Sequence, residues 1–289
     1  MNDLKTAALS TLSEAVNRFK PKAVFGLFSG GHDSLTATYI ASLHPRFTAA
    51  VHINTGIGIE ATRDFVRNTC VKRGWRLLEY KATENINAKG QPDPQNYEEM
   101  VMEYGFPGPH MHNKMYNRLK QRQLERLERD WMATPKEPII YVSGMRSQES
   151  VRRMRHTQVY QVEGRRVWVA PIHDFTKDDC GDVIKAAGLD FNPVVLHTGK
   201  SGECLCGAYA HPGELAEMKF WEETRPAHDR IVELEKRVRA AGFPWGWEEQ
   251  PPGWWKEKQA GQRFMLDYDT DTPEHLCWSC NKREEASHE

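Results

Sequence analysis

Six consecutive residues near the N-terminus have the types and order of an anion-binding loop. They are Ser29, Gly30, Gly31, His32, Asp33 and Ser34, and they join a short apolar segment to a stretch with helical spacing. Glycines let backbone N–H groups turn toward one point without Cβ clashes, and a helix start adds positive potential. The serines add hydroxyl donors, and the aspartate would cap the helix or bind the Mg²⁺ of a polyphosphate. The segment predicts a phosphate site or, on its own, only a capped tight turn.

The spacing of these glycines excludes two common nucleotide-binding motifs. The loop has neither the GxxxxGK[ST] pattern of P-loop NTPases nor the GxGxxG pattern of dinucleotide-binding folds.

Alternating strand and helix patterns surround the loop and would position it. Strands are expected at 22–28, 48–53, 76–80, 138–142 and 167–170, and helices at 2–19, 33–43, 60–72, 113–131 and 177–187. This rhythm predicts an α/β fold with an open parallel, Rossmann-like sheet, in which ligands bind beyond the carboxyl ends of the strands. Residues 85–112, rich in Pro and Gly, are expected to form a long surface excursion.

The character of the chain changes near residue 190. We therefore expect a nucleotide-binding α/β domain at 1–190 and a C-terminal helical, Cys-bearing metal subdomain at 191–289. Within the latter, 213–241 has the pattern of one long charged helix, with Pro226 inside it or dividing it, and 243–261 is a Trp-rich loop. Stacked tryptophans with nearby cations could hold single-stranded nucleic acid, or the loop could simply pack over a small core.

Four cysteines form two tight pairs. The pairs are Cys204 with Cys206 and Cys277 with Cys280, a CxC and a CxxC. Four thiolates complete either a tetrahedral Zn²⁺ site or a [4Fe-4S] cluster, although four unconnected cysteines are also compatible with the sequence. Cys70 and Cys180 fall inside expected helices and are interpreted as small core residues.

Four segments, taken in order, resemble the PAPS-reductase-like branch of the PP-loop ATP pyrophosphatase superfamily. SGGHDS at 29–34 resembles the PP-loop, and HINTG at 52–56 resembles the NTG element beside the nucleotide. The segment 143–152 resembles the GxRxxES..R loop, and 171–179 resembles the PLxxWTxxDV segment. The resemblance covers residues 22–190 and implies an adenine nucleotide alpha-hydrolase-like fold.

The resemblance also implies which residues form the site. Beyond the PP-loop, the residues expected to contact the nucleotide are Asn54, Thr55, Gly56, Gly144, Arg146 and Arg152. Arg146 would face the glycines across the crevice and bind phosphate oxygens in a bidentate manner. Lys120 would reach an anion, so Asp33, Arg146 and Lys120 are the candidate catalytic residues.

PP-loop enzymes cleave ATP at the α-phosphate to AMP and pyrophosphate, whereas the reductases of this branch bind APS or PAPS and attack sulfur with a cysteine. The tail after Cys280 contains no cysteine, which favours ATP over a sulfonucleotide. By analogy with the DNA phosphorothioation subunit, the resemblance suggests sulfur transfer to nucleic acid, with a sulfur-donor protein as a partner and [4Fe-4S] favoured over Zn²⁺. A sulfonucleotide reductase and a non-catalytic nucleotide- or nucleic-acid-binding module remain the alternatives.

Composition sets limits on partners. Lys and Arg total 39 and Asp and Glu 40, so no global field attracts nucleic acid or anionic lipid. No apolar run is long enough to span a membrane, and the N-terminus lacks a signal-peptide pattern, so a cytoplasmic location is expected. The oligomeric state is not indicated.

Overall fold

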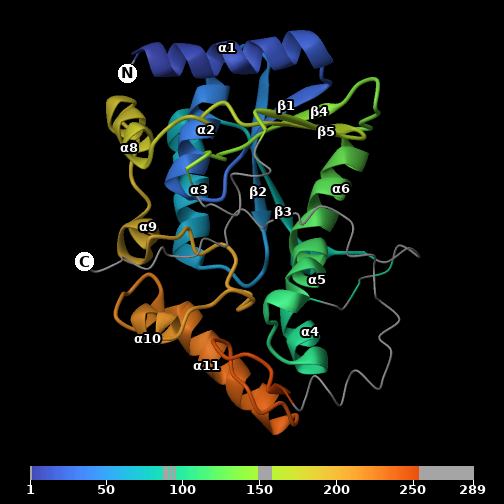
Figure 1. The fold of residues 1–289 in the computed structure, drawn as a ribbon, viewed down its shortest axis with the longest axis vertical. Coiled ribbons are helices and arrows are strands. Elements are labelled where there is room, and N and C mark those ends of the chain that lie inside the picture. Colours follow the sequence, from blue (N-terminus) through green and yellow to red (C-terminus); the bar gives the residue numbers. More distant parts are fainter. Residues whose placement is uncertain (1, 87–90, 92, 94–95, 149–157, 254–289) are drawn as a thin grey trace.

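A six-stranded sheet forms the centre of the computed structural model, which describes residues 2–86, 91, 93, 96–148 and 158–253 (Figure 1). The strands lie in the order β3-β2-β1-β4-β6-β5. Their bounds are β1 Ala23–Leu27, β2 Phe47–Asn54, β3 Leu77–Lys81, β4 Ile139–Val142, β5 Tyr160–Glu163 and β6 Arg166–Val169. All pairings are parallel except that of β5 with β6, which is antiparallel. The α/β prediction is confirmed, with the correction that β5, which was not predicted, adds an antiparallel edge.

Helices flank the sheet on both faces. Their bounds are α1 Asn2–Phe19, α2 His32–Ser42, α3 Glu60–Arg73, α4 Tyr97–Tyr104, α5 His112–Tyr116, α6 Arg122–Asp130, α8 Lys177–Ala186, α9 Pro193–Thr198, α10 Glu214–Met218 and α11 Arg225–Ala240. A π-helical stretch, Asn117–Gln121, joins α5 to α6. The expected helix at 113–131 therefore exists, but with a local change of helical type.

The strand residues alternate between two buried layers. On one face of the sheet, Val24, Ile140 and Val142 pack with side chains of α1, α2 and α8. On the other face, Phe25 and Tyr141 pack with side chains of α6. This period-2 alternation of apolar residues on both sides is expected for a parallel sheet that is covered on both faces.

One expectation for a long segment is wrong, and for another the structure selects one of the two alternatives, a helix divided near Pro226. Residues 85–112 are not simply a surface excursion, because they contain α4, whose Tyr97, Met100 and Val101 are buried. The segment 213–241 is divided into α10 and α11, with Pro226 in the first turn of α11. Proline is tolerated at that position because the first N–H groups of a helix have no intrahelical acceptor.

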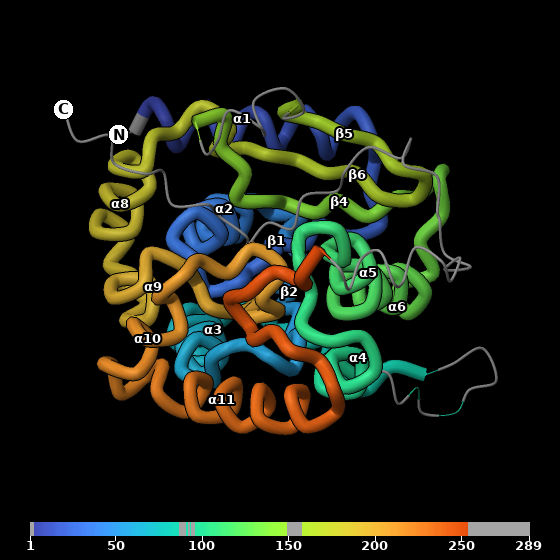
Figure 2. Tube along the Cα trace, turned by 60° about the horizontal axis from the view of Figure 1, so that its bottom comes forward, coloured from blue at the N-terminus to red at the C-terminus, as the bar shows by residue number. Residues whose placement is uncertain are grey.

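A third buried layer joins α4 to the C-terminal part of the described chain. It includes Met100 and Phe106 from the α4 region, Ile231 and Leu234 of α11, and Trp245. Figure 2 shows α11 and the segment after it lying beside α4. Trp247 is also buried, with 1% of its surface exposed, so neither Trp245 nor Trp247 is available to stack on bases. Stacking by these two tryptophans, one part of the nucleic-acid alternative, is therefore wrong; Trp254, Trp255 and the rest of the Trp-rich loop to residue 261 lie outside the described residues.

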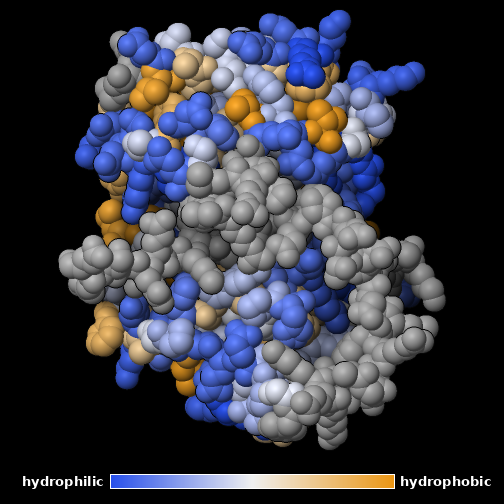
Figure 3. Space-filling model, viewed as in Figure 1, coloured by the Kyte–Doolittle hydropathy of each residue, from blue (hydrophilic) through white to orange (hydrophobic). Residues whose placement is uncertain are grey.

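On the face shown in Figure 3, the described residues are mostly hydrophilic, and the hydrophobic ones occur in small separate groups. Within the described part of the chain, no helix is both long and apolar enough to cross a membrane.

Candidate functional site

The order of the strands creates a crevice between β1 and β4. From β1 the chain moves outward through β2 and β3, and it then returns to the other side of β1 to form β4. The loops that follow β1 and β4 consequently diverge at the carboxyl edge of the sheet, where open α/β sheets bind ligands. The SGGHDS loop follows β1, and the loop containing Gly144 and Arg146 follows β4.

The SGGHDS loop has the geometry of an anion cradle. Gly30 has φ +85°, a conformation that favours glycine, and a Cβ there would lie 2.6 Å from the Thr62 side chain. Gly31 is the N-cap of α2, and Ser34 Oγ donates to its carbonyl at 2.9 Å. Ser29 N–H donates to Ser34 Oγ at 3.2 Å, which fixes the loop before the helix begins. The N–H groups at the start of α2 therefore face the crevice edge with positive potential.

The two loops touch at Gly144. A Cβ on this residue would lie 2.6 Å from the carbonyl carbon of Asp33, so only glycine fits against the first turn of α2. Next to it, Arg146 Nε lies 3.0 Å from Asp33 Oδ2, and the arginine is 8% exposed. The predicted opposition of Arg146 and the loop glycines is thus present, with Asp33 orienting the guanidinium.

A cleft extends from this contact. Of the predicted residues, those that line it are Ser29, Gly31, His32, Asp33, Ser34, Lys120, Gly144 and Arg146. Lys177 and Lys200 also line it, and Lys200 Nζ pairs with Glu214 at 2.9 Å. The cleft therefore gathers four cationic side chains around the loop, in a chain whose overall charge is close to neutral.

The environment of His32 favours the neutral form of its imidazole. Burial lowers its pKa, and the nearby Lys177 acts in the same direction against the opposing effect of Asp33. A neutral imidazole adds one donor or one acceptor to the cleft without adding charge.

Ile53 of the second strand lines the cleft, but Asn54, Thr55 and Gly56, which were expected to contact the nucleotide, do not. Asn54 Nδ2 donates to Glu79 at 2.7 Å, and Gly56 N–H donates back to Asn54 Oδ1 at 3.0 Å. Thr55 N–H donates to Glu203 Oε1 at 2.9 Å. Thr55 thus contacts Glu203, a residue that lines the cleft, but does not line the cleft itself.

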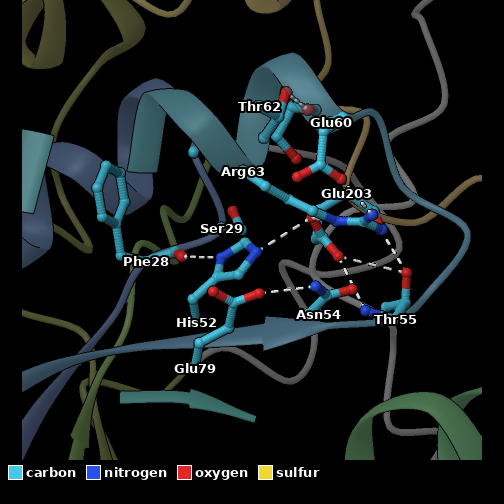
Figure 4. Close-up of polar contacts among 12 residues, drawn as sticks. Phe28, Ser29, His52, Asn54, Thr55, Glu60, Thr62, Arg63, Glu79 and Glu203 are labelled. Atoms are coloured by element: carbon cyan, nitrogen blue, oxygen red, sulfur yellow. Dashed lines mark hydrogen bonds and ion pairs between the residues drawn. The ribbon is translucent and has the colours of Figure 1, made fainter. Parts of the chain in front are cut away.

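Glu203 belongs to a buried charged cluster beneath the cleft (Figure 4). Its carboxylate lies 3.2 Å from His52 Nε2 and 3.5 Å from Arg63 Nε, and the carboxylate side chain is only 2% exposed. The other nitrogen of His52, Nδ1, donates to the Phe28 carbonyl at 2.8 Å. Burial lowers the pKa of His52, but Glu203 and the Phe28 carbonyl outweigh that effect and raise the pKa. An acceptor lies next to each ring nitrogen of His52, and this arrangement favours the imidazolium form.

Two of the four predicted metal ligands lie next to this cluster. We call residues 200–206 the cysteine strap; it contains Cys204, which is partly exposed, and Cys206, which is buried. Cys277, Cys280 and Arg152 lie outside the described residues. Among the described residues, no group of three or more His, Cys, Asp or Glu side chains has the arrangement of a metal site. Cys70 and Cys180 are core residues as expected, and burial raises the pKa of both thiols, that of Cys70 to about 12.

Several cleft residues were missed by the sequence analysis. Lys177 begins α8 directly after its N-cap Thr176, and Lys200 and Ser201 follow the glycine that ends α9. A Cβ on Gly31 would lie 3.7 Å from Ser201 Cβ, so the strap directly adjoins the SGGHDS loop. The position of Lys177 at the start of the helix expected at 177–187 was the available sequence signal for it. Nothing local marked Ser201 or Glu203.

Comparison with known proteins defines the family. Residues 23–199 match the model of the phosphoadenosine phosphosulfate reductase domain. The chain therefore belongs to this family, the PAPS-reductase-like branch of the PP-loop ATP pyrophosphatase superfamily, as its four motifs predict. None of the curated proteins matches it significantly.

Several solved structures are similar to the chain at low sequence identity. One is the PAPS reductase from Candida auris in a phosphate complex (16% identity, 67% of this chain and 85% of that one, TM-score 0.49). Another is the FMN adenylyltransferase of Candida glabrata with FAD and pyrophosphate (11% identity, 68% and 60%, TM-score 0.46). A third is the U34-tRNA thiolase NcsA from Methanococcus maripaludis with its [4Fe-4S] cluster (15% identity, 83% and 76%, TM-score 0.41).

Proposed function

We propose that the chain is a PP-loop enzyme that binds ATP with Mg²⁺ in the cleft and cleaves it at the α-phosphate, giving AMP and pyrophosphate. The observation that carries this proposal is the convergence of the SGGHDS loop, Arg146 and Lys120 on one cleft at the β1–β4 switch point. Such a cleft supplies positioning and charge stabilisation, which are the main requirements of reactions at phosphorus.

Each residue has a distinct part in this proposal. The loop N–H groups and Ser34 bind the pyrophosphate portion, and Arg146, oriented by Asp33, stabilises charge that develops during cleavage. Asp33 also supplies a carboxylate oxygen for Mg²⁺, a metal that accepts one or two carboxylates together with phosphate oxygens. Lys120 approaches from the α5–α6 side and neutralises a further phosphate charge.

The cleavage would activate an acceptor for sulfur transfer, with nucleic acid as the acceptor and a protein as the sulfur donor. In this scheme residues 191–289 form the metal subdomain, and Cys204, Cys206, Cys277 and Cys280 hold a [4Fe-4S] cluster or, alternatively, Zn²⁺. The CxC pair fits half of such a set, because it presents two thiols on one short strap. A cluster would supply sulfur or redox chemistry next to the nucleotide.

Product analysis tests the reaction directly. The protein is incubated with Mg²⁺ and ATP labelled at the α- or the γ-phosphate, with candidate acceptors, and the expected products are labelled AMP and labelled pyrophosphate. Release of orthophosphate with ADP would contradict cleavage at the α-phosphate.

One observation favours a second function, sulfonucleotide reduction, because the matching family model is that of the PAPS reductase domain. Such a reaction needs a cysteine as its nucleophile, and residues 281–289 contain none. Formation of sulfite from APS or PAPS, without pyrophosphate from ATP, would establish this alternative.

Anaerobic purification with metal analysis tests the cysteine quartet. We expect broad visible absorption together with bound iron and sulfide. One zinc per chain without that absorption would show that the cysteines hold Zn²⁺ and not a cluster.

A further inference from the structure

Hydrogen bonds attach the cysteine strap to the polypeptide that follows β2. Toward the β2–α3 region, the Ser201 carbonyl accepts from Thr62 Oγ1 at 2.5 Å, and the Glu203 carbonyl accepts from Thr55 Oγ1 at 2.6 Å. The Gly202 carbonyl, between them, accepts from the N–H of Ile59 at 2.9 Å. Three successive carbonyls are therefore fixed to the polypeptide that follows β2.

The other side of the strap is held by two large aromatic residues. Trp247 Nε1 donates to the Leu205 carbonyl at 2.8 Å, and the Tyr97 hydroxyl donates to the Cys206 carbonyl at 3.0 Å. Both aromatic side chains are buried. These contacts secure the strap but do not connect it with the phosphate loop.

Two paths connect the strap with the phosphate loop. One joins Ser201 to the Gly30 carbonyl through Thr62 and Asn192. The other runs through two side chains and reaches the residue next to Cys204. The carbonyl of Phe28, the residue immediately before Ser29, accepts from His52 Nδ1, and His52 Nε2 faces the carboxylate of Glu203 (Figure 4). Glu203 directly precedes Cys204. A continuous path of two polar contacts therefore links the backbone that begins the loop with the backbone that carries the first thiol.

The strap also lies very close to the connection between β2 and α3. A Cβ on Gly58 would lie 2.5 Å from the Glu203 carbonyl oxygen, so the strap can take this position only if residue 58 is a glycine. Burying the charged cluster of Glu203, His52 and Arg63 is not an efficient way to gain stability, since apolar residues of similar volume often do as well. The buried contact between His52 and Glu203 instead fixes the position of the strap relative to the second strand.

We propose that Glu203 is a positioning residue which, through His52, holds Cys204 and Cys206 in register with the phosphate loop. The nucleotide cleft and the cysteine pair then form one site, and a nucleotide on the loop reduces the opening of the strap. This inference rests on the proposed nucleotide-binding function, which it extends to the thiols.

Hydrogen–deuterium exchange read by peptide mass spectrometry tests the link. The probe is Mg²⁺ with α,β-methylene ATP, which cannot be cleaved between the α- and β-phosphates. Exchange is followed in peptides covering residues 29–34, which report binding at the loop, and residues 204–207, which lie beyond the strap residues that line the cleft. In the wild-type protein the probe should slow exchange at 204–207 by about fivefold or more, the lower end of typical coupling between sites.

Two substitutions of His52 each break one half of the path. His52→Asn retains a donor placed like Nδ1 for the Phe28 carbonyl, and His52→Gln retains one placed like Nε2 for Glu203. Both variants should keep probe-dependent protection at 29–34 and lose it at 204–207. If neither variant folds, Glu203→Gln is measured instead, because its amide oxygen still accepts from Thr55 N–H while the ion pair is lost.

Tyr97→Phe is the matched control. It removes one hydrogen bond to the strap without touching the path, so exchange at 204–207 should rise overall while the probe still slows it. Probe-dependent protection at 204–207 that survives in every His52 or Glu203 variant would overturn the proposal, as would its absence in the wild-type protein. Absence of protection at 29–34 would instead contradict nucleotide binding, and the positioning role would fail with it.

Discussion

The phosphate loop and the cysteine strap lie on the same cleft but are positioned by different means. The loop takes its shape from local features: a strand end, two glycines, and the start of α2. The strap has no regular secondary structure, and its main contacts are to residues far away in the chain, such as Thr55, 148 positions from Glu203. Local geometry thus provides the anion cradle, while long-range side-chain contacts determine what lies next to it.

This difference predicts that substitutions on the two sides have different consequences. The main effect of changes at the loop side should be on nucleotide binding, and the main effect of changes at the strap side should be on stability.

The largest effect on binding is expected from Arg146→Ala. It removes the guanidinium opposite the loop and leaves the Asp33 carboxylate unpaired next to the phosphates. Loss of charge-assisted hydrogen bonds of about 1.5–3 kcal/mol should weaken ATP binding roughly 10- to 150-fold. Titration calorimetry with Mg²⁺–ATP measures this, with Arg129→Ala, an exposed arginine of α6, as the control. Unchanged affinity in Arg146→Ala would remove this residue from the site.

A smaller effect is expected from Gly144→Ala. The new methyl group would meet the Asp33 carbonyl carbon at 2.6 Å and the Ser34 nitrogen at 2.7 Å, which must push the two loops apart. ATP affinity should fall by roughly tenfold, because small displacements of positioning groups strongly affect recognition. Gly181→Ala is the control, since no atom lies within 4 Å of its Cβ and alanine favours the α8 helix by up to about 1 kcal/mol. Equal affinity in both variants would show that the contact between the loops is not needed.

On the strap side, Gly58→Ala should mainly affect stability. Its Cβ would lie 2.5 Å from the Glu203 carbonyl oxygen, and overpacking of this kind costs about 1–3 kcal/mol. We expect a lower melting temperature and less bound metal, with a loss of ATP affinity smaller than that in Gly144→Ala because the loop residues are untouched. A large loss of affinity without destabilisation would contradict the distinction between the two sides.

The smallest effect is expected from Glu79→Gln, which changes the side chain that accepts a hydrogen bond from Asn54. Hydrogen bonds from Arg67, together with one from Asn54, hold the pKa of Glu79 at about 2, below its ordinary value of 4.5. Because the folded-state pKa is the lower one, this stabilisation is complete above about pH 4.5 and is lost as the pH falls toward 2.

The wild-type protein should therefore melt at a higher temperature than Glu79→Gln at pH 7, by an amount corresponding to about 1 kcal/mol. The difference should shrink steadily in melts recorded from pH 5 down to pH 2. A difference that does not depend on pH would mean that packing, and not charge, explains it.

The sequence was informative where structure is local. The loop, the parallel strands and the position of Arg146 follow from short patterns, because glycine spacing and apolar runs directly constrain the backbone. The antiparallel strand β5 was missed because its residues are only partly buried and its apolar pattern is weak.

The sequence was less informative where distant residues meet. The segment 85–112 looked like a loop because of its Pro and Gly content, yet α4 packs against α11, more than 100 residues later. Asn54, Thr55 and Gly56 were expected at the nucleotide, but in the structure they support Glu203 and the sheet edge. No short pattern identifies a residue whose partner is distant in the chain.

Equilibrium binding of Mg²⁺–ATP with pyrophosphate as competitor tests the central claim most directly. Because the loop is assigned to the pyrophosphate portion of the nucleotide, one ATP should bind per chain, pyrophosphate should displace it, and Arg146→Ala should weaken both ligands in parallel. No saturable ATP binding, or binding that pyrophosphate does not displace, would contradict the account.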